Sequence, residues 1–205
     1  MWTMIRGVRL PAAEAPRLES RRLYLRPPRL GDWRAWSSLR GRSRHFLEPW
    51  EPRWPADALS RDAFRRRLRR HAEDRRDGTG FAFHAFRRTD EALTGGITVS
   101  NLQRGISLSC SLGYWIGEPF ARQGFMTEAL SVLLPFLFEE LGLHRIEAAC
   151  LPANEASQGL LRKLGFAQEG YARGYLRING AWHDHLLFAL IAEDYRRPTA
   201  RPPKS

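Results

Sequence analysis

The segment "FARQGFMTEAL" (residues 120–130) joins an irregular stretch of chain to an apolar, amphipathic pattern. That pattern predicts a helix over residues 124–142, so the residues before it form a loop leading into a helix N-terminus. Backbone N–H groups there lack helical partners and, together with the helix dipole, favour a bound phosphate. Gly124 would let a ligand approach the backbone, and Arg122 and Gln123 add donors. The spacing matches neither a P-loop nor a Rossmann fingerprint, so on spacing alone an ordinary strand-to-helix connection is favoured.

A second group of polar side chains lies at residues 154–165, where another helix is predicted. Asn154 and Ser157 are three residues apart, so they face the same way on its first turn. Asn is also a favoured helix N-cap, which gives Asn154 a purely structural alternative.

The elements that must position these residues are predicted to form a mixed sheet with helices on its faces. Alternating apolar and polar residues indicate strands at 21–28, 81–88, 93–102, 107–117 and 144–151, and a final hairpin turning at Asn179-Gly180. Helices are indicated at 31–41, 58–76, 124–142 and 154–165. The order is βααβββαβαββ, an α/β (α+β) fold.

Prolines mark two exceptions to the regular pattern. The proline-rich segment 44–55 is expected to be a loop packed by its own aromatic residues, and Pro135 is expected to bend helix 124–142. We expect one domain at residues 19–195, between an N-terminal tail (1–18) and a C-terminal tail (196–205).

Composition limits the class of protein. The chain has 205 residues, 43% of them hydrophobic, and a formal net charge of +11, which is typical of a globular protein with an acidic partner or a solvated arginine-rich surface. Cys110 and Cys150 have no CxxC or neighbouring His pattern, so neither a disulfide scaffold nor a metal site is expected. No apolar run suits a signal peptide or a membrane span, and a cytoplasmic location is expected.

Seven short segments occur in an order and at intervals typical of one enzyme superfamily. They are "RHFLEPWEP" (44–52), "LGYWIG" (112–117), "QGFMTEAL" (123–130), "HRI" (144–146), "N-x-x-S-x-x-L-L-x-x-L-G-F" (154–166), "EGYA" (169–172) and "NGAWHDH" (179–185). On these segments the chain resembles the GCN5-related N-acetyltransferases (GNAT), and within them the bacterial ribosomal-protein-alanine N-acetyltransferases of the RimJ type. The resemblance implies the GNAT fold, with helices on both faces of a mostly antiparallel sheet and splayed parallel strands that hold acetyl-CoA.

By this resemblance, loop 121–126 cradles the pyrophosphate of acetyl-CoA. Of the usual pattern Q/R-x-x-G-x-G/A only the central Gly124 is present, and Arg122 could replace the missing first side chain. The cofactor-binding residues that the resemblance implies are Trp115, Ile116, Gly117, Arg122, Gln123, Gly124, Phe125, Met126, Thr127, Asn154 and Ser157.

The implied chemistry is attack of a free amine on a thioester, which needs an oxyanion donor, a proton for the leaving thiolate and a neutral amine. Backbone N–H groups around Trp115 and Ile116 are expected to bind the thioester carbonyl. Ser157 is expected to protonate the sulfur, with Tyr114 or Tyr171 as the alternative donor.

Three residues are candidates for the general base: Glu51, His183 and Asp184. A structural ion pair or turn contact is the alternative for each. In a two-residue hairpin His183 would lie opposite Leu176 and Asp184 opposite Tyr175, so the two side chains would point to opposite faces. Glu169 is expected to anchor its strand.

The function predicted on this basis is acetylation of a protein N-terminus, with Ala or Ser of a ribosomal protein as the acceptor. One alternative is a ribosome- or RNA-associated binding protein, because Arg65, Arg66, Arg69 and Arg70 of the predicted helix could meet rRNA phosphates. Another is a GNAT enzyme with a polyamine, aminoglycoside or lysine acceptor, although the net charge disfavours cationic small molecules. The chain could be a monomer or a dimer.

Overall fold

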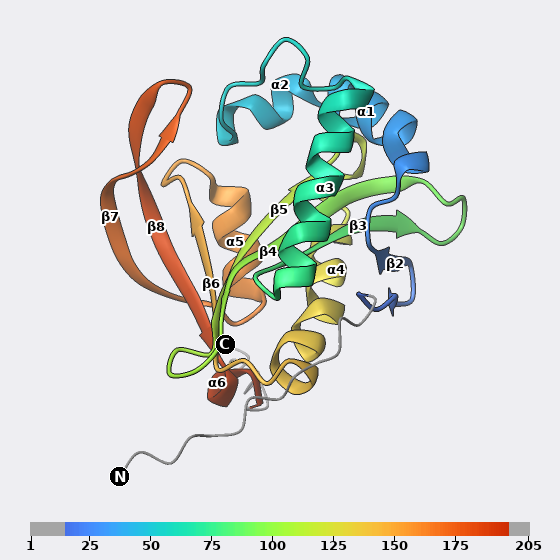
Figure 1. Ribbon diagram of the computed structural model, residues 1–205. Coiled ribbons are helices and arrows are strands. Elements are labelled where there is room, and N and C mark those ends of the chain that lie inside the picture. Colours follow the sequence, from blue (N-terminus) through green and yellow to red (C-terminus); the bar gives the residue numbers. More distant parts are fainter. Residues whose placement is uncertain (1–14, 197–205) are drawn as a thin grey trace, which may run out of the picture.

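The computed structural model describes residues 15–196, in which eight strands form one sheet (Figure 1). The strands are β1 (Leu18–Glu19), β2 (Leu23–Arg26), β3 (Phe81–Arg87), β4 (Leu93–Gln103), β5 (Ser109–Ile116), β6 (Arg145–Cys150), β7 (Ala167–Ile178) and β8 (Ala181–Ile191). Their spatial order is β1-β2-β3-β4-β5-β6-β8-β7. Only β5 and β6 pair in parallel, and the other neighbours are antiparallel. The expected mixed, mostly antiparallel sheet is confirmed.

Helices cover both faces of this sheet (Figure 1). They are α1 (Trp33–Arg42), α2 (Arg44–Leu47), α3 (Arg61–Asp77), α4 (Phe125–Pro135), α5 (Glu155–Lys163) and α6 (Ala192–Arg196). Trp36 of α1 and Phe64 of α3 belong to one buried cluster, with Phe86 of β3. The apolar side chains of α4 and α5 belong to a second, larger cluster with Cys110 and Leu112 of β5. Leu18, the last residue of the expected N-terminal tail, begins β1.

The proline-rich segment 44–55 differs from the sequence prediction. It is not all loop, because residues 44–47 form α2 and residues 48–50 form a 3-10 turn. Pro49 lies in the first turn of that 3-10 segment, where a missing N–H removes no helical hydrogen bond. Gly41 likewise lies inside α1 and does not end it. The helical hydrogen bonds of these segments form without a periodic apolar pattern, so the sequence did not indicate a helix there.

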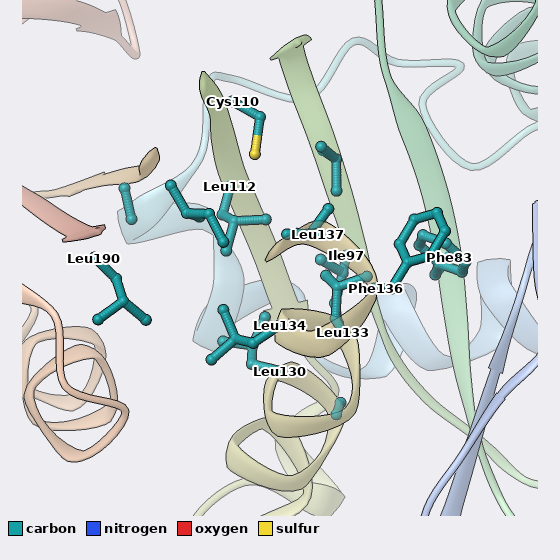
Figure 2. Packing of buried hydrophobic residues seen from close by; sticks show 14 of the residues in the cluster. Phe83, Ile97, Cys110, Leu112, Leu130, Leu133, Leu134, Phe136, Leu137 and Leu190 are labelled. Carbon is teal, nitrogen blue, oxygen red and sulfur yellow. The ribbon is translucent and has the colours of Figure 1, made fainter. Parts of the chain in front are cut away.

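Helix α4 packs its apolar face on the centre of the sheet. Leu130, Leu133 and Leu134 lie over Ile97 and Leu112 (Figure 2). After Pro135, the last residue of α4, the chain continues as one π-helical segment, Phe136–Glu140, and turns at Gly142 with φ +66°. The expected irregularity at this proline therefore takes the form of a π turn, which accommodates the missing N–H well away from the N-terminus of α4.

A buried polar network fastens α1 to β2 and β3. The two oxygens of Asp32 accept hydrogen bonds from Arg26 at 2.8 and 2.6 Å and from the Arg29 N–H at 2.8 Å. Nδ1 of His84 lies 3.2 Å from Asp32 Oδ2. Asp32 and His84 are 7% and 4% exposed, so each needs the other partners of the network to offset its desolvation.

Lowering the pH from 7 to 3 is expected to reduce the free energy of unfolding in two steps. Burial lowers the pKa of His84 and that of His71, the latter to about 4, so the unfolded chain takes up protons first as pH falls below about 6.5. Burial opposes ionisation of Asp32, but the bonds from His84 and Arg26 outweigh it and hold its pKa well below its usual range. The stability that Asp32 contributes is present above about pH 4 and is lost below it.

Urea unfolding measured at several pH values tests this expectation. The slope of stability between pH 6.5 and 4.5 should be smaller in His84→Gln than in the wild type. A free energy of unfolding that stays constant from pH 7 to 4.5 would contradict it.

Candidate active site

The parallel strands β5 and β6 separate partway along their length. They pair from Ser109↔Arg145 to Leu112↔Ala148, and no further pair follows. Beyond that point β5 remains paired with β4, as far as Gly95↔Ile116, and β6 with β8, as far as Cys150↔Leu186. The ends of β5 and β6 are therefore separated by a gap, and the backbone groups that face it have no partner strand within residues 15–196. This is the expected splay.

The backbone on the β5 edge of this gap corrects one expectation. The Gly117 N–H donates to the Thr94 carbonyl at 2.8 Å, on the β4 side. Because N–H directions alternate along a strand, the Trp115 N–H also faces β4, whereas those of Tyr114 and Ile116 face the gap. Ile116 is thus placed as expected for a carbonyl donor, and Trp115 is not. The side chain of Trp115 packs over Gly96, where an added Cβ would lie 2.6 Å from Nε1.

The loop before α4 exposes backbone donors. Its first helical hydrogen bond runs from the Glu128 N–H to the Gly124 carbonyl, 3.0 Å, so the N–H groups of residues 125–127 precede the helical ladder. Gly124 caps the helix with φ +76° and is exposed, so the backbone there is open to a ligand. The side chains of Phe125 and Met126 are buried in the core. These two residues can therefore contribute only their backbone to a cofactor site.

The two loop side chains that were expected to donate hydrogen bonds to a ligand, those of Gln123 and Arg122, have different surroundings. Gln123 donates to the Pro119 carbonyl at 2.7 Å and so braces the loop from within. Arg122 is exposed with φ +59°, an unusual conformation for a side chain with a Cβ. Of the two expected side-chain donors, only Arg122 makes no hydrogen bond or ion pair within residues 15–196.

Arg22, immediately before β2, is a residue of this site that the sequence did not single out. Its Nε donates to Glu128 Oε2 at 2.6 Å and its Nη1 to the Gln123 carbonyl at 3.1 Å. The guanidinium also lies 4.5 Å from the Phe125 ring centroid, and Nη2 would be 3.5 Å from a Cβ at Gly124. Ser20 adds a 2.7 Å bond to Glu128. These contacts join the start of β2 to the loop and place a guanidinium, paired with Glu128, beside its open N–H groups.

A pair of hydroxyl groups lies on the α5 side of the gap. Ser157 Oγ and Tyr114 Oη are 2.7 Å apart, and either can be the donor. Asn154 caps α5, its Oδ1 accepting from the Ser157 N–H at 3.1 Å, which confirms the capping role. Burial raises the pKa of Tyr114, although the hydrogen bond to Ser157 opposes the shift, so the phenol is protonated at neutral pH. The arrangement can deliver a proton to an atom in the gap.

Two of the base candidates are already engaged in hydrogen bonds. Glu51 forms an ion pair with Arg40 and accepts from Trp54 Nε1 at 2.9 Å. Asp184 accepts from Tyr171 Oη at 2.5 Å and from the Gly174 N–H at 2.7 Å. The Tyr171 hydroxyl is therefore occupied by Asp184.

The hairpin register confirms one of its two predicted pairs. His183 lies opposite Leu176 as expected, but Asp184 does not lie opposite Tyr175, because the ladder is irregular between Ala172 and Leu176. Gly174, with φ +56°, lies within the break. The His183 side chain, half-buried, makes no hydrogen bond among residues 15–196.

Within residues 15–196, no three His, Cys, Asp or Glu side chains gather as a metal ion would require. None of the helices there is long and apolar enough to cross a membrane.

The expected anchoring role of Glu169 is confirmed by its ion pair with Arg145 of β6.

Comparisons with known proteins agree with this geometry. A family model described as the acetyltransferase (GNAT) domain matches residues 22–167. The chain is 38% identical over 153 residues to the [ribosomal protein uS5]-alanine N-acetyltransferase of Escherichia coli (strain K12), covering 75% of this chain and 79% of that protein.

Solved structures show the same likeness. The ribosomal-protein-S5-alanine acetyltransferase from Vibrio fischeri superposes with a TM-score of 0.81 at 31% identity, over 89% of this chain and all of that one. Mycobacterium smegmatis RimJ in complex with CoA-disulfide gives a TM-score of 0.80 at 34% identity, over 85% and 84% of the two chains. With a splayed β5–β6 pair, an open α4 N-terminus and a matching family model, this chain belongs to the GNAT family and is an N-acetyltransferase.

Proposed function

We propose that this enzyme transfers the acetyl group of acetyl-CoA to the α-amine of a protein N-terminus, and that its acceptor is a ribosomal protein beginning with Ala or Ser. The observation that supports it most is the hydroxyl pair of Ser157 and Tyr114 beside a gap that opens toward the N-terminus of α4. The relatives from E. coli and V. fischeri, which are named as ribosomal-protein-alanine acetyltransferases, support the acceptor class.

The residues present suit acetyl-CoA. The open backbone at Gly124 and the N–H groups of residues 125–127 would hold its pyrophosphate, with Arg22 and Arg122 as the nearby cations. Bound acetyl-CoA supplies an activated acetyl thioester. The Ile116 N–H would donate to the developing oxyanion, and the hydroxyl of Ser157 would give a proton to the departing sulfur.

The acceptor amine needs only a weak base if it is an N-terminus. An α-amine has a pKa of about 8, so roughly a tenth of it is neutral at pH 7, whereas a lysine amine at about 10.4 is neutral in under one part in a thousand. We assign the proton acceptor to His183, the one base candidate whose side chain makes no hydrogen bond within the described residues. Glu51, fixed by Arg40 and Trp54, is assigned an orienting role toward the ammonium group.

Two exposed aromatic side chains suit the approach of a peptide. Trp50 beside α2 is 37% exposed and Trp182 near the hairpin tip is 68% exposed. Figure 1 shows α2 and the β7–β8 hairpin on the two sides of the end where β5 and β6 separate. Trp54 of the same segment is buried and contributes packing.

Release of free CoA from acetyl-CoA is the measurement that tests the acceptor class. The panel contains N-terminal Ala, Ser and Met peptides, an N-blocked lysine peptide, spermidine and an aminoglycoside. Ala or Ser peptides are expected to react at least about 100-fold faster at pH 7 than the blocked lysine peptide, given the neutral fractions of the two amines. Comparable turnover of the blocked peptide or of the polyamine would overturn the proposal, as would salt-sensitive binding of rRNA without turnover of any acceptor.

A further inference from the structure

A cavity of about 500 Å³ lies between α1, α3 and the segment that follows α2. Trp36, Trp54 and Trp115 contribute its aromatic wall. Trp115 follows Tyr114 on β5, and successive side chains of a strand point to opposite faces. The cavity therefore lies on the face of β5 opposite the Ser157–Tyr114 pair, one residue along the strand from it.

Mutual contacts hold the side chains that form the wall of the cavity nearest β5. Arg40 is 5% exposed, and its guanidinium lies 4.4 Å from the Trp54 ring centroid and 5.0 Å from that of Trp115. Glu51 neutralises it by an ion pair. Because both members of this pair and both rings hold one another, the wall nearest β5 is preorganised before any ligand arrives.

The charge of the cavity is not balanced. Five arginines line it, and the acids that line it are Glu51 and Asp57. Glu51 is paired with Arg40, and Asp57 with Arg66 at 2.5 Å. Arg53, Arg67 and Arg70 form no ion pair in the part of the chain that the structure describes. Three cations that face one cavity repel one another, and a bound anion would relieve that repulsion.

We propose that this cavity binds a carboxylate side chain of the acceptor peptide, so that the enzyme prefers acceptors with Asp or Glu within a few residues of the reactive α-amine. The inference rests on the proposed function, since it takes the acceptor to be a peptide. At neutral pH the carboxylate is the only anion that an unmodified peptide side chain offers. Arginines bind it by paired, charge-assisted hydrogen bonds.

Only some of the arginines of α3 line the cavity. Arg66, Arg67 and Arg70 line the cavity, whereas Arg65 and Arg69 do not. Arg65 is paired with Asp62 at 3.2 Å, and Arg69 is exposed, as Arg67 and Arg70 are, but lies outside the cavity lining. Arg69→Gln is therefore a matched control for Arg67→Gln, because it makes the same change of charge on the same helix outside the cavity.

The test uses hexapeptides that begin with Ala and carry one Glu at position 2, 3, 4, 5 or 6, each paired with its Gln counterpart. CoA release gives kcat and KM, and calorimetric titration of the same peptides into the CoA complex gives Kd. For at least one position the Glu peptide should have a KM about 10- to 100-fold lower than the Gln peptide, as expected for hydrogen bonds to a charged group. Arg67→Gln should abolish this difference in KM and Kd with kcat changed little, and Arg69→Gln should preserve it.

The outcomes separate this inference from the proposed function. Turnover of Ala peptides without a preference for Glu at any position overturns the inference and leaves the proposed function standing. No turnover of any peptide by an enzyme that binds acetyl-CoA overturns the proposed function. If Arg67→Gln instead weakens salt-dependent binding of an rRNA fragment while the peptide KM stays the same, the cavity arginines serve a nucleic acid and the inference is wrong.

Discussion

Replacing Gly124 with glutamate is expected to raise the Kd for acetyl-CoA by about 100-fold or more while the protein remains folded. Gly124 is open in the structure, with φ +76° and only Arg22 within 4 Å of the place that a Cβ would take, so the new side chain would occupy the space above the N–H groups of residues 125–127. Each charge-assisted hydrogen bond to a phosphate contributes about 1.5–3 kcal/mol, and losing two of them accounts for this factor. The added carboxylate would also repel the pyrophosphate. Calorimetric titration of CoA measures the effect without requiring turnover.

The matched control for this variant is Gly105→Glu, which separates loss of the site from general strain. Gly105 has φ +83° in the turn between β4 and β5, with nothing within 4 Å of a Cβ. Placing a side chain in this left-handed region costs about 1–2 kcal/mol at either position. Both variants should therefore lose similar thermal stability, and only Gly124→Glu should lose CoA affinity. An unchanged Kd in Gly124→Glu would mean that the phosphates bind elsewhere.

Much of the fold could be predicted from sequence because its signals are local. The alternation along β3, β4 and β5, the apolar face of α4 and the Asn179-Gly180 turn each determine their element within a few residues, and all are present. The segment 44–55 could not be predicted in this way. Its short helical turns are stabilised by burial of Leu47 and Trp54 against the rest of the molecule, which leaves no periodic signal.

Those parts of the candidate site that lie within one segment of the chain could be predicted from the sequence. Gly124 and Asn154 stand at helix starts, which a sequence reveals. Arg22 was not predictable, because its contacts with Glu128 and Gln123 span more than a hundred residues and the neighbouring Arg21 is identical in type. The orientation of the Trp115 N–H likewise depends on register with β4, which only the paired strands define.

Removing the hydroxyl of Ser157 is expected to lower kcat by about 100-fold, within the range that a positioned proton donor contributes, with little change in the Kd for acetyl-CoA. Ser157 Oγ is 2.7 Å from Tyr114 Oη, and burial raises the pKa of that phenol, so a proton is available through neutral pH and above it. Tyr114→Phe should lower kcat as well, because it removes the group from which Ser157 is resupplied. The control Ser131→Ala makes the same substitution on the exposed surface of α4, where Oγ donates only to the Thr127 carbonyl.

The double variant distinguishes the two possible donors. If Ser157 and Tyr114 act as one relay, removing both hydroxyls should cost little more than removing one, since the second loss acts on a path that is already broken. If Tyr114 alone protonates the sulfur, Ser157→Ala should change kcat only a few-fold while Tyr114→Phe carries the whole loss. A kcat that is insensitive to both substitutions would show that the thiolate leaves without help from this pair. In that case the 2.7 Å contact would serve only to hold α5 against β5 beside the gap.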